Sequence, residues 1–186
     1  MKGEITDVYM NLAKEKLDLG DCQGAIADYT EAIRLNPNLA KAYSNRGVAK
    51  SGLGDYQGAI TDYDQAVRLN PDLAEVYSNR GVAKSLLGDR EGAIADFTEA
   101  IRLAPDFAQA YSNRGMAKSE LGDNEGAIAD YNQAIRLDPD DAHVYYYRGN
   151  AKSELGDEQG ANDDYDQMAR LLQQQGVLEM YEELDP

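Results

Sequence analysis

The stretch YSNRG occupies residues 43–47 and returns unchanged at residues 77–81 and 111–115, 34 residues apart each time. Each copy is followed by one residue and then by the pair Ala-Lys. Self-similarity at a fixed period of this length is the sequence signature of a repeat architecture. The repeated stretch therefore decides the fold, and the rest of the chain shows how far the repeat extends.

Five copies of a 34-residue unit follow one another when counting starts at Thr6. They cover residues 6–39, 40–73, 74–107, 108–141 and 142–175, and we predict one array over residues 1–175. Position 4 of the unit is always tyrosine, position 8 is alanine or glycine, position 20 is always alanine, and position 24 is tyrosine or phenylalanine. Position 32 is proline in all copies except the fifth.

Each unit is predicted to form two helices. The first runs through YSNRGVAKSGL and ends at a recurring Leu-Gly-Asp triplet, in which glycine can adopt the left-handed conformation that terminates a helix. The aspartate, Asp55 in the second copy, can then cap the next helix by accepting a backbone N–H. The second helix carries apolar residues at helical spacing and ends before Asn70, because Pro71 disfavours helix in the residue before it.

The small residues at positions 8 and 20 allow the two helices to approach closely, and the rings at positions 4 and 24 fill the remaining space. One such pair cannot bury its apolar face alone, whereas stacked pairs can. The predicted fold class is therefore all-α. The glycine at position 19, such as Gly58, has no firm explanation in the sequence beyond close backbone packing.

The recurring charges predict an ion-pair ladder between the helices. Position 7 is arginine and position 11 is lysine in copies two to five, and like charges four residues apart on a helix repel each other. Position 23 is aspartate, next to the ring that packs against the first helix. We therefore predict a structural pair between positions 7 and 23, for example between Arg80 and Asp96.

The pattern closely resembles the tetratricopeptide repeat. Its consensus motif, NRGxAK…LGD…GAIxDY…AIRLxP, resembles bacterial, and especially cyanobacterial, arrays. The resemblance implies a right-handed superhelical stack of antiparallel helix pairs. It also implies a non-enzymatic scaffold for protein–protein interaction, whose first helices line a concave groove through positions 2, 5, 6, 9, 12 and 13. An extended peptide or protein tail would bind in that groove.

The predicted groove contains an asparagine ladder, a row of serines and an apolar strip. Asparagine amides both donate and accept, so a ladder of them can pair with the main chain of a peptide. The alternative is that the asparagines solvate an exposed face or bond within the array. The first four copies contribute Asn11, Asn45, Asn79 and Asn113, Ser44, Ser78 and Ser112, Val48, Val82 and Met116, and Gln109.

The fifth copy differs from the others at the groove positions, where it has His143, Tyr146, Tyr147 and Asn150. The two tyrosines predict an aromatic wall at one end of the groove, because tyrosine is favoured at binding hot spots. One branch of the family clamps the C-terminal carboxylate of heat-shock chaperones with lysine, arginine and asparagine. Here only Asn45 fits that clamp well, and Glu75 would repel a carboxylate, so we exclude that partner.

The composition restricts the other function classes. The chain has 34 acidic and 18 basic residues, and this excess argues against nucleic acid as a partner. No apolar run approaches the roughly 20 residues of a membrane span, and the first residues lack a secretory signal, so we expect a cytoplasmic protein without membrane insertion. The single cysteine, Cys22, and the single histidine, His143, form no catalytic or zinc-binding pattern. We therefore expect no enzyme activity, cofactor or metal.

The C-terminal quarter is the acidic end of the chain, with 13 acidic and 3 basic residues in 138–186. The last helix is predicted to continue to about Gln174, because no proline stops it. Residues 176–186 then form an acidic C-terminal tail or a short capping helix. The alternative function is a self-assembly module that forms homo-oligomers through the array ends or through this tail.

Overall fold

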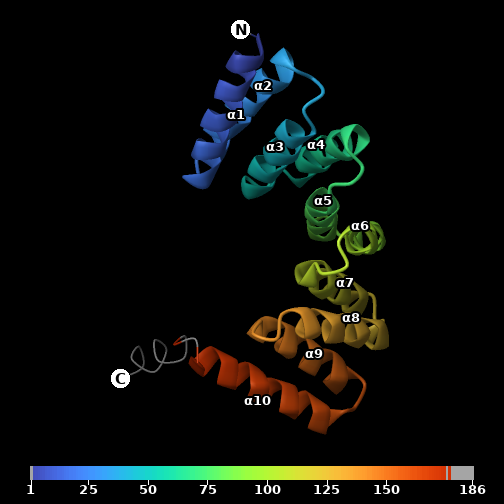
Figure 1. The fold of residues 1–186 in the computed structure, drawn as a ribbon. Coiled ribbons are helices and arrows are strands. Elements are labelled where there is room, and N and C mark those ends of the chain that lie inside the picture. The colour runs from blue at the N-terminus through green and yellow to red at the C-terminus, as the bar shows by residue number, and fades with distance from the viewer. Residues whose placement is uncertain (1, 175, 177–186) are drawn as a thin grey trace. The chain divides into compact units, whose positions relative to one another are not determined.

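The computed structural model describes residues 2–174 and Gly176, and this part of the chain consists of helices joined by short turns (Figure 1). In chain order the helices are α1 (Lys2–Asp18), α2 (Cys22–Leu35), α3 (Ala40–Gly52), α4 (Tyr56–Leu69), α5 (Ala74–Leu86), α6 (Arg90–Leu103), α7 (Ala108–Glu120), α8 (Asn124–Leu137), α9 (Ala142–Glu154) and α10 (Glu158–Gln174). The all-α prediction and the assignment of two helices to each repeat are confirmed.

The chain divides into two compact units, Met1–Leu103 and Ala104–Pro186, and each is described here by itself. In the first unit, the pairs α1–α2, α3–α4 and α5–α6 pack together, and α2 contacts α3 as α4 contacts α5. In the second unit, α7–α8 and α9–α10 form the pairs, and α8 contacts α9. The prediction of one array over residues 1–175 stays a prediction.

The predicted turn between the helices of a pair is confirmed. Gly54 has a φ of 80°, and the side chain of Asp55 accepts a hydrogen bond from the N–H of Gly58, with 2.9 Å between N and Oδ1. A Cβ atom at Gly58 would lie 2.1 Å from Oδ2 of Asp55. The glycine at position 19 therefore makes room for the capping carboxylate rather than for another backbone.

The core confirms the predicted role of the small residues. A Cβ atom at Gly47 would lie 2.6 Å from the ring of Tyr63, so glycine lets this ring lie flat against the first helix of its pair. Around it pack the fully buried alanines Ala59 and Ala66 and, from the next pair, Val76. The same arrangement of alanines around a buried ring recurs in the pairs α1–α2 and α7–α8.

The predicted ladder of arginine and aspartate is also confirmed. Arg80 donates to both carboxylate oxygens of Asp96, with distances of 2.6 and 2.9 Å, and the equivalent pairs form in copies two, four and five. Lys84 joins the same carboxylate at 2.8 Å, a contact that the sequence did not predict. The cations at positions 7 and 11 therefore share one buried anion instead of repelling each other.

The fifth copy shows how strongly the carboxylate is held. Burial alone would raise the pKa of Asp164, but hydrogen bonds from Arg148 and Lys152 outweigh burial and lower that pKa. The first copy differs, because Leu12 stands at the arginine position and Asp28 is paired with Lys16 at 2.6 Å. The complete ladder of arginine, lysine and aspartate therefore forms in copies two to five and not in the first copy.

The last helix, α10, reaches Gln174 as predicted. Leu171 is buried, and Met168 packs against the same cluster in the place where the earlier copies have a buried alanine. The predictions for the tail fall on residues 177–186, which lie outside the described residues.

Candidate functional site

The first helices of neighbouring repeats contact each other within each unit, as α1 does with α3, α3 with α5, and α7 with α9. Equivalent positions of these helices therefore follow one another along one face of the unit. We call this surface the first-helix face. It carries the residues that the sequence predicts for the groove, and the contacts below show which of them are available to a partner.

The asparagines of the first unit differ in how they are held. Asn11 is exposed, whereas Asn45 and Asn79 are half-buried. Nδ2 of Asn45 donates to the hydroxyl of Tyr29 at 3.2 Å, which fixes the plane of the amide. Burial raises the pKa of Tyr29, so this hydroxyl stays protonated near neutral pH. Among the described residues, Asn79 has no hydrogen-bond partner for its side chain.

The predicted serines are less accessible than the asparagines. Ser44 is half-buried, but Ser78 and Ser112 are only 3% exposed. Ser78 lies one helical turn before Gly81, on the side where the ring of Phe97 packs against the helix. A partner cannot reach these two serines without moving the pair apart, so we leave both out of the contact surface proposed below.

The apolar strip runs beside the asparagines. Val82 is 38% exposed, and Val48 is half-buried against the core around Tyr63. In the second unit, Met116 is half-buried and packs against the cluster that contains Tyr131. Val82 is thus the member of this strip that offers the most side-chain surface.

The amides of the second unit are bonded to each other. Nε2 of Gln109 donates to Oδ1 of Asn113 at 2.9 Å, and Asn113 is only 8% exposed, while Gln109 itself is exposed. The alternative interpretation, that asparagines bond within the array, therefore describes Asn113 better than it describes Asn79.

The two extra tyrosines of α9 form an aromatic cluster with neighbouring rings. Tyr147 is stacked on Tyr131 with 6.2 Å between ring centroids, and Tyr146 meets Tyr147 edge-on at 5.7 Å. Tyr146 is 45% exposed and also lies beside Tyr165, whose hydroxyl donates to Oδ1 of Asn150 at 2.9 Å. These rings form one aromatic cluster with Tyr146 open to solvent, and its role as the end wall of a groove stays a prediction.

The remaining predicted residue, His143, is exposed at the start of α9. Its Nδ1 lies 3.3 Å from Oδ1 of Asp141, the residue that caps this helix. The imidazole therefore lies beside the capping carboxylate at the start of α9. Among the residues that the structure describes, no group of three or more His, Cys, Asp or Glu side chains could hold a metal ion.

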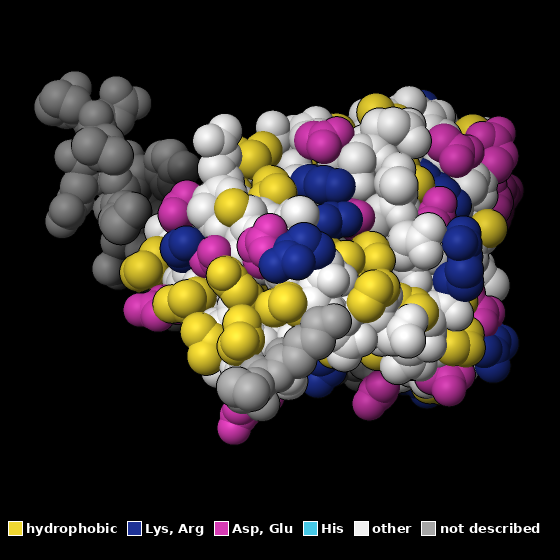
Figure 2. All heavy atoms as spheres, turned by 90° about the horizontal axis from the view of Figure 1, so that it is seen from above, with side chains coloured by type: hydrophobic (Ala, Val, Ile, Leu, Met, Phe, Trp, Pro, Cys, Tyr) yellow, Lys and Arg dark blue, Asp and Glu magenta, His cyan; other side chains and the backbone are white. Residues whose placement is uncertain are grey.

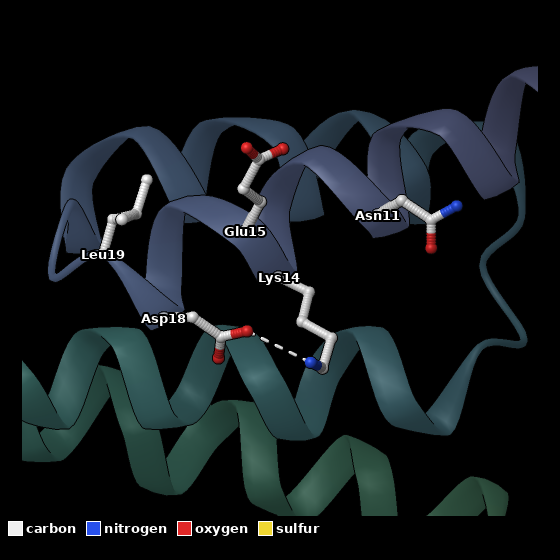
Figure 3. A pocket seen from close by; sticks show the side chains of 5 residues that line it. All are labelled: Asn11, Lys14, Glu15, Asp18 and Leu19. Atoms are coloured by element: carbon white, nitrogen blue, oxygen red, sulfur yellow. Dashed lines mark hydrogen bonds and ion pairs between the residues drawn. The ribbon is translucent and has the colours of Figure 1, made fainter.

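A shallow pocket of about 300 Å³ lies on the first-helix face of α1 (Figure 3). Asn11, Lys14, Glu15, Asp18 and Leu19 line it, and two of them, Lys14 and Asp18, form an ion pair of 3.1 Å. Apart from Asn11, these residues were not among the predicted site residues. Positions 9 and 13 of the unit, which Lys14 and Asp18 occupy, could have identified two of them.

Within the described part of the chain, none of the helices is both long enough and apolar enough to span a bilayer.

Comparison with known proteins finds the same repeat along most of the chain. A family model described as TPR repeat matches residues 13–54, 52–88 and 117–156, and a second one, described as Tetratricopeptide repeat, matches residues 74–107. Together these matches cover well over half of the chain. A search of curated protein sequences finds no match.

Solved structures share the fold over almost the full length. A crystal structure of MamA protein is 26% identical, with a TM-score of 0.84, and the match covers 94% of this chain and 95% of that one. MamA 41-end from Desulfovibrio magneticus RS-1 is 23% identical over 94% and 99% of the two chains, with a TM-score of 0.87. YrrB, described as a TPR protein with an unusual peptide-binding site, is 19% identical over 94% and 90%, with a TM-score of 0.77. With its helix pairs, capped turns and matching family models, the chain belongs to the tetratricopeptide repeat family.

Proposed function

We propose that the protein is a non-enzymatic scaffold that binds an extended segment of another protein on the first-helix face of its first unit. One observation carries this proposal. Asn79 and Val82 lie one turn apart on α5, the amide has no partner among the described residues, and the valine is 38% exposed. An amide able to donate and accept, next to an apolar side chain, suits a peptide main chain with alternating side chains.

The neighbouring helix repeats this pair of groups. Asn45 and Val48 occupy the same positions of α3, which contacts α5. Packed helices lie about 8–10 Å apart, and an extended chain advances about 3.3 Å per residue. The two asparagines would therefore bond main-chain groups about three residues apart. The description of YrrB as having a peptide-binding site supports a peptide ligand for this fold, although at 19% identity it does not identify the site here.

The pocket beside Asn11 would receive the end of such a segment. Its ion pair between Lys14 and Asp18 is exposed, and exposed pairs contribute little to stability, so a polar ligand group can displace it at low cost. Glu75, at the predicted groove position of α5, is exposed and disfavours an acidic ligand next to Asn79. Binding to the C-terminal carboxylate of heat-shock chaperones is therefore still not expected.

The test uses a displayed library of random peptides, selected on the wild-type protein. The best peptide is then titrated against a variant with Asn45→Ala and Asn79→Ala. Each lost amide–main-chain bond is worth about 1 kcal/mol, so Kd should rise about thirtyfold for the two together. The matched control is Asn38→Ala, an exposed asparagine in the turn after α2, which should leave Kd unchanged. Equal affinity of the double variant and the wild type would refute the proposed site.

Homo-oligomerisation, the alternative drawn from the sequence, stays a prediction. At the end of the second unit α10 exposes polar side chains such as Asn162 and Asp166, which gives this surface little reason to self-associate. Light scattering over a range of protein concentrations measures the mass directly, and a mass that stays constant would remove this alternative.

A further inference from the structure

Helix α1 carries an apolar stripe that nothing in the described part of the chain covers. Ile5, Val8 and Leu12 are 49%, 54% and 42% exposed, and their spacing of three and four residues places them on one side of the helix. Hydrophobic side chains gather on the surface at this end of the molecule (Figure 2). We call this stripe, together with Glu15 one turn further on, the α1 edge.

The other repeats show what normally lies on this side of a first helix. Val8 is at position 3 of its unit, and the equivalent residues Ala42, Val76 and Val144 are at most 2% exposed. Each of them is covered by the second helix of the preceding repeat, for example by Tyr63 of α4 over Val76. The α1 edge is therefore the same kind of surface without its covering helix.

Two residues make the α1 edge different from its internal counterparts. The first is Leu12, which replaces an arginine that elsewhere bonds across to a polar residue of the preceding second helix, as Arg80 does to Asp64 at 2.7 Å. The second is Glu15, which is exposed and replaces an alanine that is buried in the later repeats, such as Ala83. On a surface that contacts only water, arginine is more favourable than leucine. The leucine at this position therefore indicates a contact with a partner.

These two exchanges also define the side chains that a covering helix needs. In the later repeats, Asp64 of α4 lies opposite the arginine of α5. Ile60, one turn closer to the start of α4, packs in the cluster that contains the buried alanine Ala83. A helix over α1 would instead need an aliphatic side chain opposite Leu12 and a cation opposite Glu15. Pairing of that kind selects a partner by rejecting mismatched ones.

None of this chain's own second helices meets both requirements. Opposite Leu12 they would place polar residues, namely Thr30, Asp64, Thr98, Asn132 and Asp166. Opposite Glu15 they would place Ile26, Ile60, Ile94, Ile128 and Asn162, none of which is a cation. A second copy stacked end to end through α10 would put the carboxylate of Asp166 against Leu12 and leave Glu15 without a counter-charge. The five second helices of this sequence therefore do not supply a matching cover for the α1 edge.

We propose that the α1 edge docks one amphipathic helix of another protein, antiparallel to α1. That helix carries small and aliphatic side chains over Val8, an aliphatic side chain opposite Leu12, and a lysine or arginine opposite Glu15. This surface shares only Glu15 with the pocket beside Asn11, so the proposal does not depend on the binding of an extended peptide. A scaffold with both surfaces brings two proteins together.

The test uses two synthetic helices built from the chain's own template. The parent peptide has the sequence of residues 55–70, and the matched peptide carries Ile60→Lys and Asp64→Leu; both are stabilised by a side-chain crosslink, because helices of this length are marginal in water. Each is titrated into the full-length protein labelled with ¹⁵N, and the amide signals of Val8 and Leu12 are followed. The matched peptide should bind at least about tenfold more tightly, the factor expected for one well-packed side chain.

A protein variant makes the test specific. With Leu12→Arg and Glu15→Ala, the α1 edge has the internal residues again, and the preference should reverse in favour of the parent peptide. This variant and the variant Val8→Asp are checked for unchanged helicity by circular dichroism. The proposal is overturned by equal affinities for the two peptides, by shifts confined to other helices, or by a mass that doubles with concentration and returns to the monomer value with Val8→Asp.

Discussion

Replacing Asp96 with asparagine should strongly destabilise the protein. The carboxylate is only 4% exposed and receives three charge-assisted hydrogen bonds, two from Arg80 and one from Lys84, at 2.6–2.9 Å. Asparagine keeps the shape of the side chain but leaves two cations without their shared anion. Breaking a buried pair in this way costs about 3–5 kcal/mol, and we expect the lower end because the arginine also contacts Asp64.

The assay is urea unfolding followed by helical circular dichroism at neutral pH, as a double-mutant cycle with Arg80→Met. Methionine keeps the packing of the arginine stem while removing the charge. Residues that share a hydrogen-bond network usually show coupling energies of about 0.5–3 kcal/mol, and we expect a value of about 2 kcal/mol here. A coupling energy near zero would refute the reasoning that the ladder stabilises the helix pair.

The first copy supplies the matched control for this cycle. Asp28 occupies the same position but contacts Lys16, whose side chain is 38% exposed, and no arginine is present. Asp28→Asn should therefore reduce the free energy of unfolding clearly less than Asp96→Asn does. Equal losses would mean that the buried contact with arginine adds no stability beyond that of the exposed contact with lysine.

Three further changes test other parts of the fold. Gly115→Ala places a Cβ atom 2.7 Å from the ring of Tyr131 and should cost about 1–3 kcal/mol in urea unfolding; an unchanged midpoint would contradict the close packing. Asp55→Ala removes the cap of α4 and should cost about 1 kcal/mol, with Asp55→Asn as the control that retains a capping oxygen. Burial raises the pKa of Tyr63, so its stabilising contribution is complete below the ordinary value of 10 and is lost as pH rises toward the raised value. Unfolding free energy measured from pH 8 to 12 should thus fall less steeply in Tyr63→Phe, and identical slopes would contradict this.

The sequence alone could predict the features that depend on local chemistry. The turn at Gly54 and Asp55 follows from the conformational freedom of glycine and the capping ability of aspartate. The pair between Arg80 and Asp96 follows from like charges that need a counter-ion near a packed ring. In both cases the repeat supplied several independent copies of the same argument, and the structure confirms them.

Other features depend on contacts between helices that periodicity does not give. Ser78 lies at the border of the predicted face, and the depth of Phe97 beside it decides that it is buried. Asn45 is held by Tyr29 of the preceding repeat, sixteen residues earlier, which no spacing rule within one helix can show. Likewise, Leu12 acquires significance only when the partner of the arginine in the later repeats is known.

The most direct test of the proposed function is a crystal structure of the protein with a peptide selected from the random library. Our account predicts an extended peptide on the first-helix face of the first unit, with main-chain groups bonded to the amides of Asn45 and Asn79 and an apolar side chain on Val82. A peptide bound instead along α2, α4 and α6, or one that leaves both asparagines without a contact, would contradict it.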